Sequence, residues 1–364
     1  MEIGGLTRWG AIALGAAALA VAAGCGDDEG DSTTTAESGG TDLSAVKDYL
    51  TAHTADLAAA TQTMKELGDR YYELAESEDF DYEKLMDSHG EEVASLMGKS
   101  KAVYDKANPA YEEMEGIVAG VPRLAQYDVD IDAGSDASDP ANAVSFSLEL
   151  PNGDTLTQPG NAFFVTETAL YGTDKKFVAS GVTQDVDGDG RAEFGEGIPD
   201  ANIYKAMVDK FAELAADLDA DAQAFEPTTS DAFTAITVMT PTMSEYFEAW
   251  KNTRAIAGAQ ATDPAFVARS RLYDIADILE GLVLTYHQVK PLVADESKAQ
   301  AEQTGQALND LLSFVEDLRD REAAGTQFTA EQADTLGSEA QSQAEAIAGQ
   351  VTQAAQRLNV ELQA

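Results

Sequence analysis

The sequence is poor in cysteine and in basic residues, and each shortage excludes a class of protein. A single cysteine in 364 residues can form neither an internal disulfide nor a cysteine-rich zinc site. Only 23 lysines and arginines stand against 65 aspartates and glutamates, which gives a formal net charge of -42. A surface this acidic repels the phosphates of nucleic acids, so we expect no nucleic-acid partner and a preference for cations.

Long apolar runs are scarce as well, and the one that stands out follows Arg8 and covers residues 11–23. It is too short to span a bilayer, but it has the length and the basic flank of an export signal. We therefore predict a signal peptide over residues 1–24. No other apolar run in the sequence is long enough to cross a membrane.

The predicted signal ends in Val-Ala-Ala-Gly followed by Cys25, which resembles a lipoprotein box. In such a box the cysteine is acylated and becomes the first residue of the mature protein. Residues 25–40 are rich in Gly, Ser, Thr, Asp and Glu, a composition typical of a flexible tether. We therefore expect an exported lipoprotein, anchored to membrane lipid through Cys25, in the periplasm or at the cell surface. The alternative is a cysteine that only ends a cleaved signal.

Apolar side chains recur at helical spacing over most of the remaining chain. Val46, Leu50 and Leu57 begin a stripe of this kind, and similar stripes continue to about residue 126 and again from residue 200 onward. We therefore predict an all-α fold of two antiparallel helical bundles packed together. The N-terminal bundle covers residues 41–126 and the C-terminal bundle covers residues 200–364.

Local signals predict where several helices of the C-terminal bundle begin and break. A helix that starts near Ser230 is expected to kink at Pro241, because proline cannot continue the backbone hydrogen bonding of a helix. Two further helices are expected over about 265–290 and 296–322. Thr329, with Gln332 three residues later, is a capping-box pattern and predicts the start of the last helix.

Residues 127–199 differ in composition and are predicted to form an irregular insert between the bundles. Residues 145–150 alternate between polar and apolar side chains, and Pro-Asn-Gly-Asp follows at 151–154 as a turn. This pattern predicts a short β-hairpin.

The strongest motif of the insert is an EF-hand-like calcium loop. Residues 185–196 match the twelve-residue pattern D-x-D-x-D-G-x5-E, with Gly190 at the position of the sharp turn. The expected ligands are Asp185, Asp187, Asp189, the backbone carbonyl of Arg191, Glu193 and Glu196. We predict a structural calcium ion here; the alternative is an ordinary acidic loop in a very acidic protein.

With the helices placed, three segments resemble the imelysin-like family, in particular its EfeO-type exported lipoproteins that are associated with iron uptake. Tyr-Glu-Glu-Met-Glu at 111–115 is similar to the family's Y-E-x-x-E helix, and Asp-Ile-Ala-Asp at 274–277 is similar to its D-L-x-D helix. Residues 163–172, which end in Ala-Leu-Tyr-Gly, are similar to its G-x-H-x-x-E segment and the A-L-W-G that follows. The resemblance implies a cation pocket between two bundles, formed by Glu112, Glu115, Glu167, Asp274 and Asp277.

The chain departs from the family pattern at one position that matters. When the segments are aligned on residues 169–172, the family's histidine falls at Phe164, whereas its glutamate is retained as Glu167. The sequence also lacks H-E-x-x-H and G-x-S-x-G motifs, so we expect no peptidase activity and no enzyme. His53, His89 and His287 are expected in core or capping roles; the alternative is that one of them replaces the missing imidazole.

The spacing of the acids supports a cation site independently of the resemblance. Glu112 and Glu115 are three residues apart, as are Asp274 and Asp277, so each pair projects from one face of its helix. Converging carboxylates suit a hard, oxygen-seeking cation such as ferric iron or calcium. The alternative is that these are solvated acids with no ligand.

Two functions from different classes follow from these features. The first is a binding lipoprotein that captures iron, or an iron complex, and presents it to a membrane permease that works with a peroxidase-like partner. The second is a metal-independent surface scaffold that has kept the fold and lost the pocket chemistry.

Overall fold

The computed structural model describes residues 41–183 and 196–363. These residues are mostly helical, with 73% helix and 5% strand, which confirms the predicted helical class. The predicted signal peptide, Cys25 and the tether lie outside the described residues. So do five of the six predicted calcium ligands, Asp185, Asp187, Asp189, Arg191 and Glu193.

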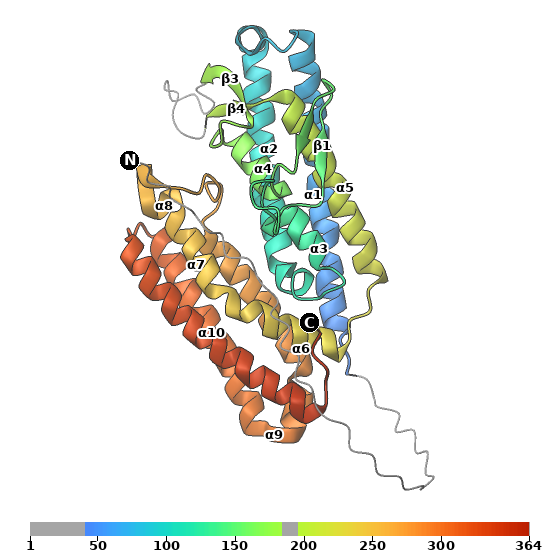
Figure 1. Cartoon of the computed structure of the whole chain (residues 1–364), viewed down its shortest axis with the longest axis vertical. Helices are drawn as coiled ribbons and strands as arrows, with labels where there is room; N and C mark the ends of the chain where they lie inside the picture. The colour runs from blue at the N-terminus through green and yellow to red at the C-terminus, as the bar shows by residue number, and fades with distance from the viewer. Residues whose placement is uncertain (1–40, 184–195, 364) are drawn as a thin grey trace.

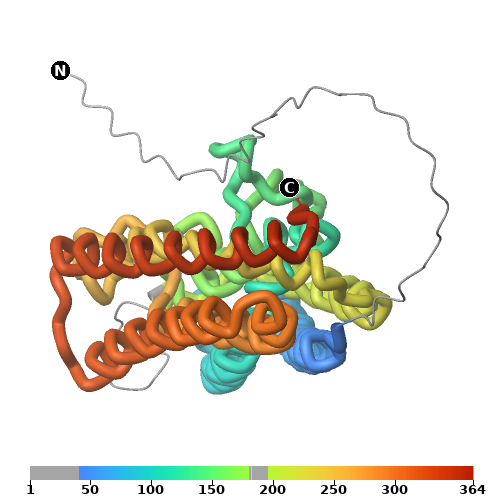
Figure 2. The backbone as a smooth tube through the Cα atoms, turned by 90° about the horizontal axis from the view of Figure 1, so that it is seen from below, coloured from blue at the N-terminus to red at the C-terminus, as the bar shows by residue number. Residues whose placement is uncertain are grey.

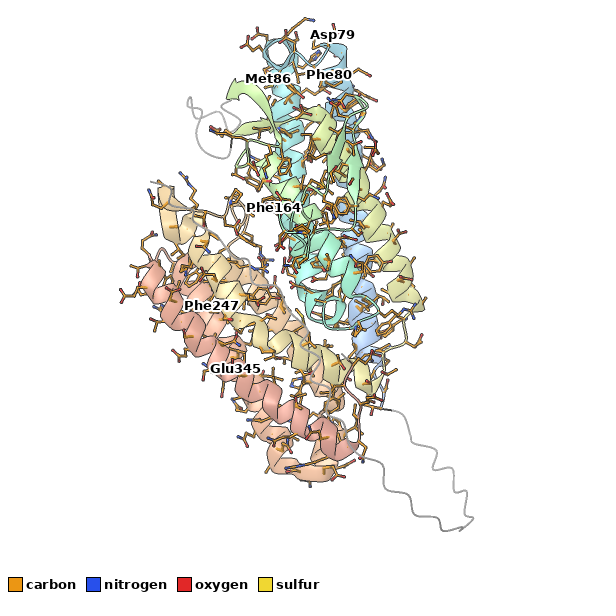
Figure 3. The ribbon with its side chains drawn as sticks, viewed as in Figure 1. Asp79, Phe80, Met86, Phe164, Phe247 and Glu345 are labelled. Atoms are coloured by element: carbon orange, nitrogen blue, oxygen red, sulfur yellow. The ribbon has the colours of Figure 1, made fainter. Side chains whose placement is uncertain are left out.

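Two long helices form an antiparallel pair at the N-terminal end of the described chain, α1 (Ser44–Ser77) and α2 (Tyr82–Val118). The apolar stripe of α1 is buried as predicted, and Leu50 and Leu57 are fully covered. Asp79 and Phe80 adopt left-handed φ angles of 53° and 59° in the turn that joins the helices, at the top of Figures 1 and 3.

The division of the helices differs from the predicted boundary at residue 200. Helix α5 (Ala201–Ala224) packs along α1, although the predicted C-terminal bundle includes it. The two helices approach closely at Gly68, where an added Cβ would lie 2.6 Å from the side chain of Val208. An amphipathic stripe shows which face of a helix is buried but does not name the partner, so the sequence pattern could not assign α5 to α1.

The insert contains the predicted hairpin. Strand β1 (Ser147–Glu149) pairs antiparallel with β2 (Thr155–Thr157), and Leu148 faces Leu156. Two helical segments precede the hairpin, α3 (Ala125–Asp128) and the π-helix η1 (Val129–Ala133), and α4 (Ala162–Leu170) follows it.

A second antiparallel pair flanks the predicted calcium loop. Strands β3 (Val178–Thr183) and β4 (Gly197–Pro199) pair so that Thr183 stands opposite Gly197. The segments on either side of the predicted loop are therefore strands, and their pairing brings its two ends together.

The remaining helices pack against one another as a second group. Helix α6 (Thr229–Met239) gives way to the 3-10 turn η2 (Thr240–Thr242) and then to α7 (Met243–Asn252), so the chain breaks at Pro241 as predicted. The short segments α8 (Arg254–Ala257) and η3 (Gly258–Gln260) come next. They are followed by α9 (Arg271–Ala323) and α10 (Ala330–Leu358), and Thr329 and Gln332 form the predicted capping box before α10.

Helix α9 contains both of the helices predicted between residues 265 and 322. Ser297 has a non-helical backbone conformation, and the hydroxyl of Tyr286 donates a hydrogen bond to the carbonyl of Ala301 over 3.0 Å. Because these two residues are 15 positions apart, the chain must reverse direction near Ser297. The final part of α9 then leads into α10, which runs beside it (Figure 2).

The first part of α9 packs against α2 and joins the two groups of helices. An added Cβ at Gly281 would lie 2.4 Å from the carbonyl oxygen of Glu113, so the two backbones are as close as glycine allows. This crossing brings the acidic segments 112–115 and 274–277 to one interface. None of the helices described is long and apolar enough to cross a bilayer.

Candidate functional site

Three carboxylates gather where α2, η1 and α9 meet. Glu112 and Glu115 lie one turn apart on α2, with exposed fractions of 0% and 2%. One carboxylate oxygen from each of Glu112, Glu115 and Asp132 lies within 4.8 Å of the others. Oxygens at this separation form a candidate site for a hard cation.

Asp132 lies on η1, a π-helical segment of a kind that is often found at functional sites. At the end of α3, directly before η1, Asp128 accepts a hydrogen bond of 2.8 Å from the hydroxyl of Tyr111. Asp130 points elsewhere and accepts hydrogen bonds from the backbone and the hydroxyl of Ser145, which ties η1 to the chain entering the hairpin. Asp128 and Asp132 were not predicted as site residues, because helical periodicity ends at this point in the sequence; the acids alternating at 128, 130 and 132 were the available signal.

Among the residues that the structure describes, Arg271 in the first turn of α9 brings a positively charged side chain into contact with the cluster. Its side chain is 7% exposed, and its Nη1 lies 3.2 Å from Oδ2 of Asp274 and 3.6 Å from Oε2 of Glu112. The guanidinium lies over the rings of Tyr246 and Phe266, at 4.6 Å and 4.9 Å from their centroids.

The negative charge around Arg271 exceeds what one guanidinium can neutralise. Six described carboxyl groups lie within its electrostatic reach, and they belong to Glu112, Glu115, Asp128, Asp132, Asp263 and Asp274. Unpaired charges are strongly unfavourable in a buried site. The cluster must therefore hold protons, or a cation, in addition to Arg271.

Three buried oxygens of the cluster have no hydrogen-bond partner among the described residues: Oε2 of Glu112, Oε2 of Glu115 and Oδ1 of Asp274. Oε1 of Glu112 accepts from the side-chain amide of Asn108 over 3.0 Å, and Oε1 of Glu115 accepts from the hydroxyl of Tyr246 over 2.7 Å. The second oxygen of each glutamate, Oε2, is buried and unpartnered. Since buried polar atoms are almost always paired, these oxygens indicate a missing ligand or proton.

Burial shifts the acid–base equilibria of the cluster strongly. It raises the pKa of Asp132 to about 7 and that of Asp274 to about 8, although the charge of Arg271 opposes both shifts. The pKa of Glu112 is raised well above its usual range by burial and by the neighbouring Asp274 and Asp132. Protons therefore occupy part of the cluster near neutral pH, and a bound cation would displace them.

Glu167 and Asp277 lie next to the cluster but use their carboxylates differently. Glu167, on α4, accepts hydrogen bonds from the backbone amides of Phe266, Val267 and Ala268 over 2.8, 2.9 and 2.9 Å. These amides belong to residues 261–270, which we name the η3–α9 loop. Asp277 pairs instead with Arg269 of that loop, 2.7 Å from its Nη1. Of the five acids predicted to share a pocket, the structure gathers Glu112, Glu115 and Asp274 around Arg271.

No histidine joins the cluster. Phe164, which stands at the family's histidine position, packs its ring against Phe177 at 6.3 Å between centroids and lies on α4 at the centre of Figure 3. Nε2 of His53 lies 2.7 Å from Glu113, and Nε2 of His89 lies 3.3 Å from Glu78. The third histidine, at position 287, is exposed.

A hollow of about 620 Å³ lies on α1 and α2, and His53, Asp105 and Glu113 are among its lining residues. Burial raises the pKa of both Asp105 and Glu113, and in both the charge of Arg269 opposes the shift. Arg269 also acts on Asp274. It therefore lies within electrostatic reach of both the hollow and the buried cluster.

Two comparisons with known proteins bear on this arrangement. A family model described as imelysin matches residues 97–354, a span that contains every residue of the cluster. A search of curated proteins found no match.

Proposed function

Because the chain belongs to the imelysin family, we propose that it is an exported, lipid-anchored binding protein that captures a hard cation, iron above all, in the buried cluster. The observation that carries this proposal is the pair of unpartnered, buried Oε2 atoms of Glu112 and Glu115 beside Asp132. Together with Asp132 they converge from α2 and η1, as ligands of one ion do, and the surrounding negative charge exceeds that of Arg271.

Iron is the proposed cargo for two reasons. Carboxylate oxygens are hard ligands and favour ferric iron or calcium over soft metals. The three acidic segments also resemble those of EfeO-type iron-uptake lipoproteins. In this role the protein would present the ion to a membrane permease that works with a peroxidase-like partner, and lipid on Cys25 would hold it at the membrane.

A binding role is favoured over peptidase activity by the composition of the cluster. It offers carboxylates, tyrosine hydroxyls and a guanidinium, and the family's imidazole is replaced by Phe164, whose ring packs on Phe177. An activated water on a catalytic metal usually relies on histidine ligands together with a general base.

Calcium in the 185–196 loop is a second, structural part of the proposal. The pairing of Thr183 with Gly197 supports it, because β3 and β4 hold the two ends of the loop together. An ion bound by the six predicted ligands would then fasten this hairpin.

The competing function is a metal-independent scaffold. It is supported by Arg271, which already supplies one positive charge to the cluster, while raised pKa values let protons supply the rest. The helical bundles would then serve only as a scaffold at the cell envelope, and the cluster would bind no ion.

Cation titrations separate the two functions. The test uses protein carrying Asp185→Ala, which disables the calcium loop, and adds calcium or ferric iron supplied as a soluble chelate. We expect a remaining site whose affinity falls by about tenfold or more in Glu115→Gln and in Asp132→Asn. Glu248→Gln is the matched control, because it removes the same charge from an exposed position on α7. The absence of any site that these two substitutions weaken would favour the scaffold.

A further inference from the structure

Glu167 holds the η3–α9 loop from a distant part of the chain. It lies on α4, almost one hundred residues before the loop, and its two oxygens accept three successive backbone amides, those of Phe266, Val267 and Ala268. A carboxylate that accepts several backbone N–H groups makes strong, charge-assisted hydrogen bonds. Glu167 therefore fixes the stretch of the loop from Phe266 to Ala268.

The fixed loop controls the environment of Arg271. Phe266 has a φ of 55°, a left-handed conformation that is unfavourable for a residue with a bulky side chain and persists only where its surroundings impose it. Its amide is one of the three that Glu167 binds, and its ring covers one face of the guanidinium of Arg271 at 4.9 Å. A direct chain of contacts thus leads from Glu167 through Phe266 to Arg271.

Arg271 approaches the same oxygens that a bound cation would use. Its Nη1 lies 3.6 Å from the unpartnered Oε2 of Glu112, and its Nη2 lies 3.8 Å from Oδ2 of Asp132. Both distances exceed a hydrogen bond, so the guanidinium neutralises these oxygens without satisfying them. A cation placed between Glu112, Glu115 and Asp132 would meet the positive charge of Arg271 at close range.

From these contacts we infer that Arg271 is a built-in competitor of the cation, and that Glu167 is the positioning residue that sets the strength of this competition. The inference rests on the proposed function, because it concerns the same site. It names the residues that limit the affinity for the cation and that favour ions of higher charge. A multiply charged ion gains more from four or five carboxylates than a monovalent ion does, so it competes better with a fixed guanidinium. Glu167, which the resemblance assigns to the cation pocket, then acts on the site through the loop.

The test measures terbium binding to full-length protein that carries Asp185→Ala. Terbium is a hard trivalent ion, and its luminescence is sensitised by nearby tyrosines such as Tyr111 and Tyr246, which contact the cluster. The variants are Arg271→Met, Glu167→Gln and the double variant. Arg269→Met is the matched control, because it removes the same charge two residues away, in the η3–α9 loop, at a residue that pairs with Asp277.

We expect Arg271→Met to bind terbium about tenfold tighter or more, and Arg269→Met to change affinity much less. Glu167→Gln should also tighten binding in the parent protein and should have no further effect in the Arg271→Met background. If Glu167 had only a structural role, Glu167→Gln would lower the melting temperature, and its effect on terbium affinity would not depend on Arg271. Equal effects of Glu167→Gln in both backgrounds would overturn its positioning role.

Phe266→Leu keeps the test decisive if Arg271→Met fails to fold, because it leaves every charge in place and removes only the ring that covers the guanidinium. It should tighten terbium binding in the same direction, by a smaller factor. Unchanged or weaker binding in this variant would contradict the competition.

The outcomes also separate this inference from the proposed function. Binding in the parent that Arg271→Met does not tighten would overturn the inference and leave the function intact. Binding that appears only after Arg271→Met would support the competition and overturn the function, because arginine would then hold the place of the ion. No binding in either protein would overturn both.

Discussion

At the scale of single residues, the site depends on an imbalance between Arg271 and the carboxylates around it. Asp274 lies 3.2 Å from the guanidinium, yet burial still raises its pKa to about 8. One arginine therefore leaves the cluster short of positive charge, and protons and cations compete for the remaining oxygens.

Cation binding should weaken as pH falls from about 8.5 to 6. Asp274 and Asp132, whose pKa values are raised to about 8 and about 7, take up protons over this range, and those protons must leave before the ion enters. Calorimetric titrations of calcium into protein carrying Asp185→Ala, in buffers of different ionisation enthalpy, would measure the protons released. An affinity that is independent of pH in this range would contradict the cluster as the site.

The stability of the metal-free protein should change with pH in the matching direction. Groups whose pKa is raised on folding bind more protons in the folded state than in the unfolded state. Their contribution to the free energy of unfolding is therefore present below about pH 4 and is lost as pH rises to about 8. We therefore expect that, in the presence of chelator, the melting temperature falls less steeply between about pH 4 and about pH 8 in Asp132→Asn than in the parent protein. Identical slopes would show that Asp132 does not titrate as described.

Some residues of the site could be predicted from the sequence and others could not. Glu112, Glu115 and Asp274 were found because helical spacing places them beside an apolar stripe, so the packing of α2 on α9 was enough to bring them together. Asp132 depends on a π-helical turn, and Arg271 depends on a loop held by Glu167 through tertiary hydrogen bonds. Neither arrangement follows from local spacing.

At the scale of elements, close contact between α2 and α9 positions the cluster. The glycines at 116 and 281 allow it, since a Cβ at either position would come within 3 Å of the facing helix. Pro241 and the capping box at Thr329 were predictable because they act through local backbone chemistry. The pairing of α5 with α1 was not predictable, because it depends on shape complementarity between distant segments.

Gly281→Ala should separate α9 from α2 and lower the free energy of unfolding by about 1–3 kcal/mol, because the added methyl group would overlap the carbonyl oxygen of Glu113. The matched control is Gly349→Ala on α10, where an added Cβ meets nothing within 4 Å. That change should stabilise the protein by about 0.5–1 kcal/mol through helix propensity. Urea denaturation measures both. Equal effects of the two substitutions would argue against the close crossing.

The loop between β3 and β4 should couple calcium to stability. At free calcium about a hundredfold above its dissociation constant, binding should add about 2.7 kcal/mol to the free energy of unfolding. Asp185→Ala combined with Glu196→Gln should abolish most of the calcium-dependent rise in melting temperature. A rise that persists at full size would place the ion elsewhere.

At the scale of the whole molecule, the acidic surface and the proposed anchor agree with a cation-binding role at a membrane. A net charge of -42 raises the local concentration of cations around the protein and repels anionic partners. Attachment through lipid would keep the loaded protein near a permease without any membrane-spanning helix.

Cys25→Ser should release the protein from the membrane into the soluble fraction. Two acyl chains on one cysteine hold a protein stably, and no other described segment is apolar enough to replace them. Membranes washed without detergent and probed for the protein provide the measurement. Retention of the variant on washed membranes would contradict lipid anchoring at this residue.

The central claim, that the buried cluster holds a cation, is tested most directly by the metal content of full-length protein purified from its own membranes without chelators or affinity tags. Elemental analysis should find iron in the parent protein, in addition to the calcium expected from the 185–196 loop. We predict that Glu112→Gln combined with Glu115→Gln removes the iron and leaves the calcium. Iron that is unchanged in this variant, or absent from both proteins, would contradict the account.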